Sequence, residues 1–335
     1  MIEIFSSVMI IIGTLIGAGF ASGQEIATFF NYFGDFGMYG IIIAAILFGI
    51  VIFAVLELID KNNIGKYEDL IKNNKFILCI IKFFSIICFC IMVSAIGAYG
   101  DEMFGISHWY GAVSASVVCG LIFLFKYKGL EKLNGFLVPF ILLGVFLLGT
   151  YNFTGEEIIT NTANEVQSTL INSWWLSAIL YAAYNSILLI PILVELKEYK
   201  LSKLKNIFIS LITMLLFALL GLWIYKVINV YYPDILGYDI PTLGVAKFAN
   251  SFISVYYSLI ILFAVFTTAF SCGYAFLRMN NEKNYLRNTI IICVLAVFLS
   301  KIGFAEMINL FFPVFGYFGI AQFIIIALAN RRRKK

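Results

Sequence analysis

Residues 13–25 are the part of the chain whose residue types and spacing could do chemistry. They read Gly-Thr-Leu-Ile-Gly-Ala-Gly-Phe-Ala-Ser-Gly-Gln-Glu, so four glycines and one carboxylate interrupt a run that otherwise reads as a membrane helix. In hydrocarbon every backbone N–H and C=O group needs a partner, so a break at membrane depth survives only where it is buried in protein or lines a polar cavity. A broken first helix is therefore typical of a binding site in a secondary transporter.

The glycines indicate what this break can bind. Gly17 and Gly19 permit backbone angles that other residues adopt only at a cost, and an unwound turn exposes the N–H groups of Ala18, Gly19 and Phe20 at the start of a second half-helix. The partial positive charge of a helix start favours a carboxylate or another anionic group. The alternative is that the glycines only allow close helix packing.

Glu25 has two interpretations that the sequence leaves open. A carboxylate within a span is a functional hypothesis by default, and Glu25 could carry a coupling proton or pair with a substrate amine. Yet Ser22-Gly23-Gln24-Glu25 is also a capping box, in which Ser22 caps the second half-helix and Glu25 reaches back to the Ser22 amide.

A second set of oxygens predicts a cation site. Ala264, Thr267 and Thr268 offer a carbonyl and two hydroxyls at positions i, i+3 and i+4, on one helical face. Gly13 and Ile16 lie just before the break, where carbonyls lose their intrahelical donors. Five oxygens without a formal charge suit a hard monovalent cation better than a divalent one. The alternative is that the threonines bond carbonyls of their own helix.

Polar side chains also gather at the middle of the apolar run over residues 172–195. Tyr181, Tyr184 and Asn185 would offer an aromatic, hydrogen-bonding pocket for a small zwitterion or an organic cation held by cation–π contact. Because Pro191 follows them, this helix is also expected to break. The alternative is an unbroken helix in which Asn185 and Ser186 make interhelical hydrogen bonds.

Composition defines the elements that must position these residues. The chain has 335 residues, of which 62% are hydrophobic and 13% charged, whereas a soluble domain is about half apolar and a quarter charged. This predicts a polytopic membrane protein folded as one bundle. The basic residues that give the net charge of +4 lie in short loops and a tail. They therefore indicate how the chain is oriented in the membrane, and not that it binds nucleic acid. We expect no enzyme activity, because no nucleophile–base pair or metal-ligand spacing is present.

Ten membrane spans are predicted, at residues 5–31, 38–60, 76–100, 109–126, 133–150, 172–195, 206–228, 249–278, 288–303 and 306–329. The segments between them alternate sharply in charge. Nearly all basic residues fall on one side, and only Lys226, Lys247 and Lys301 fall on the other. By the positive-inside rule both termini are cytoplasmic. The expected location is the cytoplasmic membrane, with the lipid bilayer as surroundings.

Ten spans with both ends on one side divide into five plus five, and an odd number per half inverts the second half. The prediction is an all-α membrane protein with one transmembrane domain over residues 1–335, in which residues 5–150 and 172–329 form an inverted repeat with broken helices one and six. Between spans seven and eight, residues 240–248 could form a short helix that acts as a lid.

Residues 13–20 resemble the first-helix signature of the amino acid–polyamine–organocation superfamily, whose transporters have the five-plus-five LeuT-like fold. The longer run from Gly17 to Glu25 also resembles a bacterial branch of that superfamily, the YkvI-like membrane proteins. The resemblance covers the whole chain in span count and orientation. Its residue-level match is confined to spans one, six and eight.

The resemblance implies roles for particular residues. It assigns the substrate carboxylate to the amides of Ala18 and Gly19, and sodium to the five oxygens described above. Proton-coupled relatives replace this sodium with a lysine on span five, and span five contains no lysine here. The chain departs from the leucine-transporter branch at span three, where Phe89 and Met92 lie near the middle and no tyrosine does, which weakens the carboxylate assignment.

The predicted function is secondary active transport, as sodium-coupled symport of a small amino acid or related amine. The candidate substrate-binding residues are Ala18, Gly19, Phe20, Ser22, Tyr181, Tyr184 and Asn185. Glu25 is the candidate coupling residue. No organic cofactor is expected, and the oligomeric state stays open. The alternatives are a proton-coupled carrier that uses Glu25, a membrane metabolite sensor with the same fold, and a channel.

Overall fold

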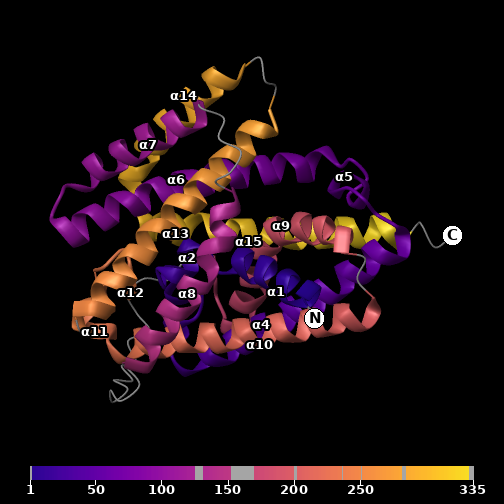
Figure 1. The fold of residues 1–335 in the computed structure, drawn as a ribbon, viewed down its shortest axis with the longest axis horizontal. Helices are drawn as coiled ribbons and strands as arrows, with labels where there is room; N and C mark the ends of the chain where they lie inside the picture. Colours follow the sequence, from indigo (N-terminus) through magenta and orange to yellow (C-terminus); the bar gives the residue numbers. More distant parts are fainter. Residues whose placement is uncertain are drawn as a thin grey trace.

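The computed structural model describes residues 2–124, 131–151, 170–199, 202–235, 237–249, 251–280 and 284–331. These residues are helical, and no strand occurs among them (Figure 1). Glu156 and Glu157, an acidic pair between the fifth and sixth predicted spans, and most of the basic tail lie outside the described residues.

The helices follow one another along the chain in the order that the apolar runs predict. Their bounds are α1 (Ile2–Leu15), α2 (Ala18–Ala21), α3 (Gln24–Phe29), η1 (Asn31–Phe33), α4 (Asp35–Asn62), α5 (Tyr67–Leu70), α6 (Lys75–Phe104), α7 (His108–Leu124), α8 (Glu131–Tyr151), α9 (Trp174–Glu195), η2 (Leu196–Tyr199), α10 (Lys203–Val230), α11 (Tyr232–Ile235), α12 (Pro241–Phe248), α13 (Ser251–Arg278), α14 (Tyr285–Leu299), η4 (Ser300–Ile302) and α15 (Phe304–Arg331).

Seven of the described helices are long and apolar enough to cross a membrane, namely α4, α6, α9, α10, α13, α14 with η4, and α15. Shorter apolar helices fall at the other three predicted spans, within α1, α7 and α8. The chain is therefore a multi-pass membrane protein, as its composition predicts.

The first predicted span consists of three short helices. The chain leaves α1 at Ile16, and Gly17 is extended with φ −85° and ψ −169°. After α2 it turns again at Gly23, whose φ of +76° is a left-handed conformation that glycine adopts without strain. A Cβ added at Gly23 would lie 2.7 Å from Cγ2 of Thr242, so α12 packs directly against this turn.

The sixth predicted span is not broken, which corrects the expectation from the sequence. Helix α9 runs continuously from Trp174 to Glu195 and carries Pro191 inside it. The polar side chains bond within the continuous helix, because Asn185 donates to the Tyr181 carbonyl at 3.1 Å and Ser186 to the Ala182 carbonyl at 2.7 Å. These bonds lie within α9, so they are not the interhelical bonds of the alternative either.

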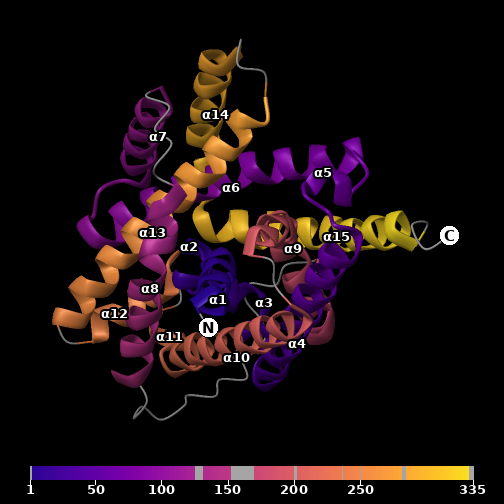
Figure 2. The ribbon, with the colours of Figure 1, turned by 45° about the vertical axis from the view of Figure 1, so that its right-hand side comes forward.

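The long helices pack in two groups. Helix α4 contacts α9 and α10, and α1 also packs on α9 and α10. In the second group α6 contacts α13, α7 and α14. Helix α15 contacts both α9 and α6, and α8 contacts both α13 and α10, so these two helices join the groups. In both views α7 and α14 lie together at one edge, opposite α4 and α10, and α2 lies between the groups (Figures 1 and 2).

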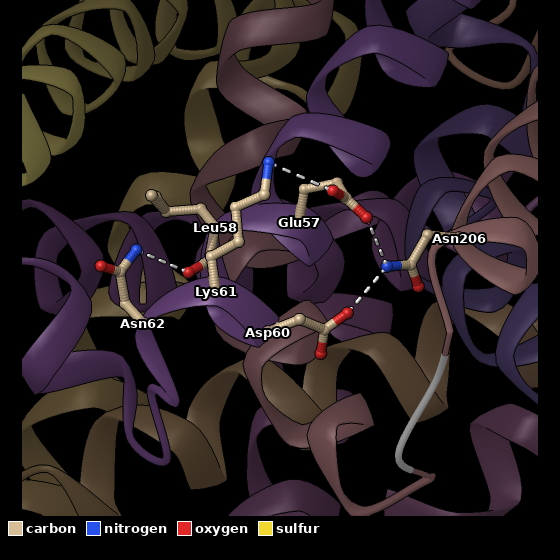
Figure 3. A network of polar contacts seen from close by, with 6 residues as sticks. All are labelled: Glu57, Leu58, Asp60, Lys61, Asn62 and Asn206. Carbon is tan, nitrogen blue, oxygen red and sulfur yellow. Dashed lines mark hydrogen bonds and ion pairs between the residues drawn. The ribbon is translucent and has the colours of Figure 1, made fainter.

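A polar network ties the ends of α4 and α10 together (Figure 3). Asn206 is fully buried, and its Nδ2 donates to Asp60 Oδ2 at 2.8 Å and lies 3.3 Å from Glu57 Oε1. Lys61 forms an ion pair with Glu57 at 3.4 Å. One amide group thus serves two carboxylates of the neighbouring helix.

We expect Asn206→Ala to destabilise the protein, because both carboxylates lose a buried donor. Hydrogen bonds to charged groups contribute about 1.5–3 kcal/mol to stability. Thermal unfolding of the purified protein in detergent measures the effect. Asn62→Ala is the matched control, since exposed Asn62 donates only to the Leu58 carbonyl of its own helix. Equal midpoints for the two variants would contradict a stabilising network.

Candidate functional site

Glu25 lies at the centre of the candidate site. It is the second residue of α3, just past the break in the first segment, and only 6% of it is exposed. Its Oε2 accepts hydrogen bonds from two tyrosines of α9, from Tyr181 at 3.1 Å and from Tyr184. The structure therefore joins Glu25, the candidate coupling residue, to two tyrosines that the sequence nominated for the substrate pocket.

No basic side chain among the described residues forms an ion pair with Glu25; the two ion pairs found there join Lys61 to Glu57 and Lys205 to Glu3. The carboxylate is held by neutral hydroxyl donors. A buried carboxylate with only neutral partners is costly to keep ionised, so this group is suited to exchange a proton or to bind a cation.

Gly19 makes room for the carboxylate. A Cβ added at Gly19 would collide with Oε1 of Glu25 and would lie 2.9 Å from its Cδ. A Cβ added at Gly17, in contrast, would meet no heavy atom within 4 Å. The two glycines therefore have different uses: Gly19 lies against Glu25, and Gly17 borders open space.

We expect Gly19→Ala to disturb the site far more than Gly17→Ala. With a methyl group at position 19 the Glu25 side chain must swing away from Tyr181 and Tyr184, which breaks hydrogen bonds worth about 1.5–3 kcal/mol each when one partner is charged. The extended backbone of Gly17 is accessible to alanine. Thermal unfolding of both variants measures the difference, and equal losses would contradict this packing of Glu25 on Gly19.

The amides predicted to bind an anion begin α2. Ala18, Gly19 and Phe20 are buried and occupy its first turn, where a helix leaves its N–H groups without intrahelical acceptors. Among the described residues the Gly17 N–H also donates to no carbonyl. The Phe20 ring, however, packs on Phe217 with 5.6 Å between centroids, so its side chain belongs to the core.

The capping box predicted for Ser22 and Glu25 forms only in part. Ser22 Oγ lies 3.3 Å from the Gln24 N–H at the start of α3 and donates to the Gly19 carbonyl at 2.8 Å. The Ser22 N–H donates to the Ala18 carbonyl, and the Glu25 carboxylate faces the tyrosines. The Glu25 side chain therefore does not make the contact with the Ser22 amide that a capping box requires.

Aromatic rings enclose the two tyrosines. Tyr184 stacks between Phe29 and Phe312, at centroid distances of 5.5 and 4.7 Å. Tyr181 meets Phe29 edge to face at 5.2 Å. These contacts fix the hydroxyls toward Glu25, and they give the surroundings of the carboxylate an aromatic character that suits a cation. The remaining predicted residue of this helix, Asn185, is half-buried and bonds within α9.

The predicted sodium ligands come from α1, from Ile16 at its end and from α13, and α13 packs against α2, the short helix that follows Ile16. Ile16 is buried just before the break, and Gly13 is half-buried near the end of α1. Thr267 Oγ1 lies 2.9 Å from the Phe263 carbonyl and 3.2 Å from the Ala264 carbonyl of its own helix. The Thr267 hydroxyl thus bonds carbonyls of its own helix, which is the alternative to a sodium site. Thr268, the next residue, is half-buried.

Polar residues that the sequence did not single out extend from Glu25 along α3. Thr28 Oγ1 donates to Asn309 of α15 at 2.5 Å and lies 3.5 Å from Gln24 Nε2. The sequence did carry a signal for this polar cluster, because Gln24, Glu25 and Thr28 fall within five positions of a predicted membrane span. Their partner on α15 lies 281 positions further along the chain, beyond the reach of local patterns.

The short helix predicted before span eight is present as α12. It packs against the backbone carbonyl groups of Ala21 and Ser22, where α2 ends. Thr242 donates through its hydroxyl to the Ala21 carbonyl at 2.8 Å and through its N–H to the Ser22 carbonyl at 3.1 Å. The Tyr257 hydroxyl of α13 also donates to the Ala21 carbonyl, at 2.7 Å. These donors satisfy backbone acceptors that a broken helix leaves open at membrane depth.

Comparison with known proteins gives two relatives of nearly full length. The chain is 27% identical over 342 aligned residues to the uncharacterized membrane protein YkvI of Bacillus subtilis, with 96% of this chain and 95% of that protein covered. It is 23% identical over 336 aligned residues to the uncharacterized protein YyaD of the same organism, with the same coverage. No family model matches the chain. The relatives agree with the YkvI-like resemblance and with a membrane protein.

Proposed function

We propose that the chain is a secondary active transporter that moves a small amino acid or a related amine across the cytoplasmic membrane by alternating access. One observation carries this proposal: Glu25 is buried beside the break in the first segment, with two tyrosine hydroxyls of α9 as its hydrogen-bond partners. Ionisable groups at membrane depth are costly and mark pathways for ions or substrates.

We propose ten spans in a five-plus-five inverted repeat, which the helix packing supports, with both termini cytoplasmic, as the charge of the loops indicates. In such a repeat, spans one to five correspond to spans six to ten. The contact of α4 with α9 (spans two and six) then corresponds to the contact of α10 with α1 (spans seven and one). The contact of α8 with α13 (spans five and eight) corresponds to the contact of α15 with α6 (spans ten and three). Related contacts of this kind are expected when two halves share one fold in opposite orientations.

The substrate is proposed to lie between α2 and α9. The N–H groups of Ala18 and Gly19 would bind a carboxylate, and the Glu25 carboxylate next to them would bind an ammonium group. An amino acid carries both groups, and an amine carries the second. Tyr181 and Tyr184 would contribute aromatic surface to the cation.

Sodium is the proposed coupling ion, bound by Gly13, Ile16, Ala264, Thr267 and Thr268, and α13 packs on α2, which begins two residues after Ile16. A proton on Glu25 is the second candidate, favoured by the neutral partners of its carboxylate. Sodium binding would stabilise one arrangement of α1 and α13, whereas protonation would act on the contact of α3 with α9.

Uptake into proteoliposomes tests the proposal and separates the two coupling ions. A mixture of the twenty amino acids and simple amines is presented under an inward sodium gradient at constant pH, or under an inward proton gradient without sodium. Sodium coupling predicts accumulation in the first arm, and a higher sodium requirement for Thr268→Ala. Proton coupling predicts accumulation in the second. Accumulation in neither arm would contradict secondary active transport.

A further inference from the structure

Side chains of α7 and α14 line an apolar groove. These two helices lie at the edge of the molecule away from α4 and α10 (Figure 1). The volume of the groove is about 480 Å³, within the range of about 300–1,000 Å³ that is usual for ligand pockets. Val117 of α7 and Val294 of α14 line it and are 56% and 49% exposed. The groove therefore opens toward the surroundings of the protein.

The groove wall offers no unsatisfied hydroxyl. The Ser116 hydroxyl donates to the Cys293 carbonyl at 2.8 Å, and the Thr289 hydroxyl donates to the Tyr285 carbonyl at 3.0 Å. The residues that line the groove include no charged side chain. Such a surface suits a hydrocarbon chain and not a polar ligand.

The length of the groove matches one leaflet of a bilayer. Its lining runs along α14 from Leu286 to Phe298, a separation of twelve residues and hence about 18 Å at the helical rise. One half of a hydrocarbon core is about 15 Å thick. An extended acyl chain in the groove would reach from the interface to near the middle of the membrane.

A lysine stands at one end of the groove. Lys301 Nζ lies 5.2 Å from the ring centroid of Trp109 and 5.8 Å from that of Phe298, and both rings line the groove. Lys301 is exposed, and no carboxylate among the described residues forms an ion pair with it. Cation–π contacts thus hold an uncompensated positive charge over the mouth of an apolar groove.

We propose that this groove binds one anionic phospholipid, with an acyl chain between α7 and α14 and the headgroup phosphate on Lys301. A second copy of the chain fits less well. In a twofold dimer the groove of one copy would face the groove of the other. Among the described residues, the groove and its mouth supply Lys301 but no carboxylate that could pair with the Lys301 of the second copy. A phospholipid supplies both the apolar chain and the negative charge.

Native mass spectrometry of the delipidated protein tests this proposal with two added lipids, dioleoyl phosphatidylglycerol and dioleoyl phosphatidylcholine. They share their chains and differ in net charge. We expect the anionic lipid to be retained about fivefold more than the zwitterionic lipid, the effect of one lysine near an anionic headgroup. Lys301→Gln should remove this preference, and Val117→Phe, which fills the groove, should lower retention of both lipids severalfold.

Each of the two test variants has a matched control variant. Lys75→Gln removes an exposed lysine at the start of α6, and Val255→Phe enlarges an exposed valine of α13 outside the groove. Both should behave as the unaltered protein. Equal retention of the two lipids, an unchanged preference in Lys301→Gln, or a Val117→Phe variant that matches Val255→Phe would each overturn the proposal. So would a dimer whose formation excludes lipid.

Discussion

Replacing Glu25 with glutamine is expected to reduce transport at least tenfold while the protein stays folded. Glutamine keeps an oxygen that accepts from Tyr181 and Tyr184, so the local hydrogen bonds survive. It cannot ionise, so neither a coupling proton nor an ammonium group is bound. Loss of one interaction with a charged group, about 1.5–3 kcal/mol, corresponds to a factor of about 10 to 150.

Uptake and thermal unfolding, measured on the same preparation, separate function from folding in this variant. Glu68→Gln is the matched control, because Glu68 is an exposed carboxylate on the short helix α5. Full transport activity with unchanged pH dependence in Glu25→Gln would mean that the carboxylate only shapes the broken segment.

The second large effect is expected where α15 crosses α9. A Cβ added at Gly319 would collide with the Ala183 carbonyl and lie 3.1 Å from Ala183 Cα. A Cβ added at Gly316 would lie 2.8 Å from the Cβ of Leu180. Small residues allow membrane helices to approach this closely. Gly319→Ala should therefore destabilise the protein by about 2–3 kcal/mol, in the range of overpacked cores.

This variant should also lower transport, because Leu180 and Ala183 flank the tyrosines that hold Glu25. Gly100→Ala is the matched control: a Cβ on Gly100 of α6 would lie 4.0 Å from Cα of Gly111 on α7, an ordinary van der Waals contact. Alanine is also the better helix former by about 1 kcal/mol. If Gly319→Ala unfolds at the temperature of Gly100→Ala, α15 and α9 are not packed this closely.

The apolar segments were predictable because their signal is local. Helix α4 covers Asp35–Asn62 where the sequence predicts a span at 38–60, and α13 covers Ser251–Arg278 where it predicts 249–278. Both are apolar runs between charged segments, and each forms its backbone bonds internally. The short helix α12, with Pro241 at its first position, was predictable for the same reason.

Contacts between distant segments were not predictable. The sequence nominated Glu25 for coupling and the two tyrosines of α9 for the substrate pocket, and their hydrogen bonds to Glu25 span 156 and 159 positions. The continuity of α9 was missed because Pro191 suggested a break, whereas Asn185 and Ser186 bond within the helix. Whether a polar residue bonds its own helix or another depends on neighbours that a single span does not reveal.

Counterflow in proteoliposomes tests the transport proposal most directly, because only a carrier with alternating access exchanges solutes across a sealed membrane in this way. Liposomes containing the protein are loaded with millimolar unlabelled amino acids and simple amines, and the same compounds carrying heavy isotopes are added outside at micromolar concentration. The prediction is that at least one labelled compound rises transiently above its equilibrium level inside, saturably, and that Glu25→Gln suppresses the rise. Entry of no labelled compound, or entry proportional to concentration without a transient, would contradict it.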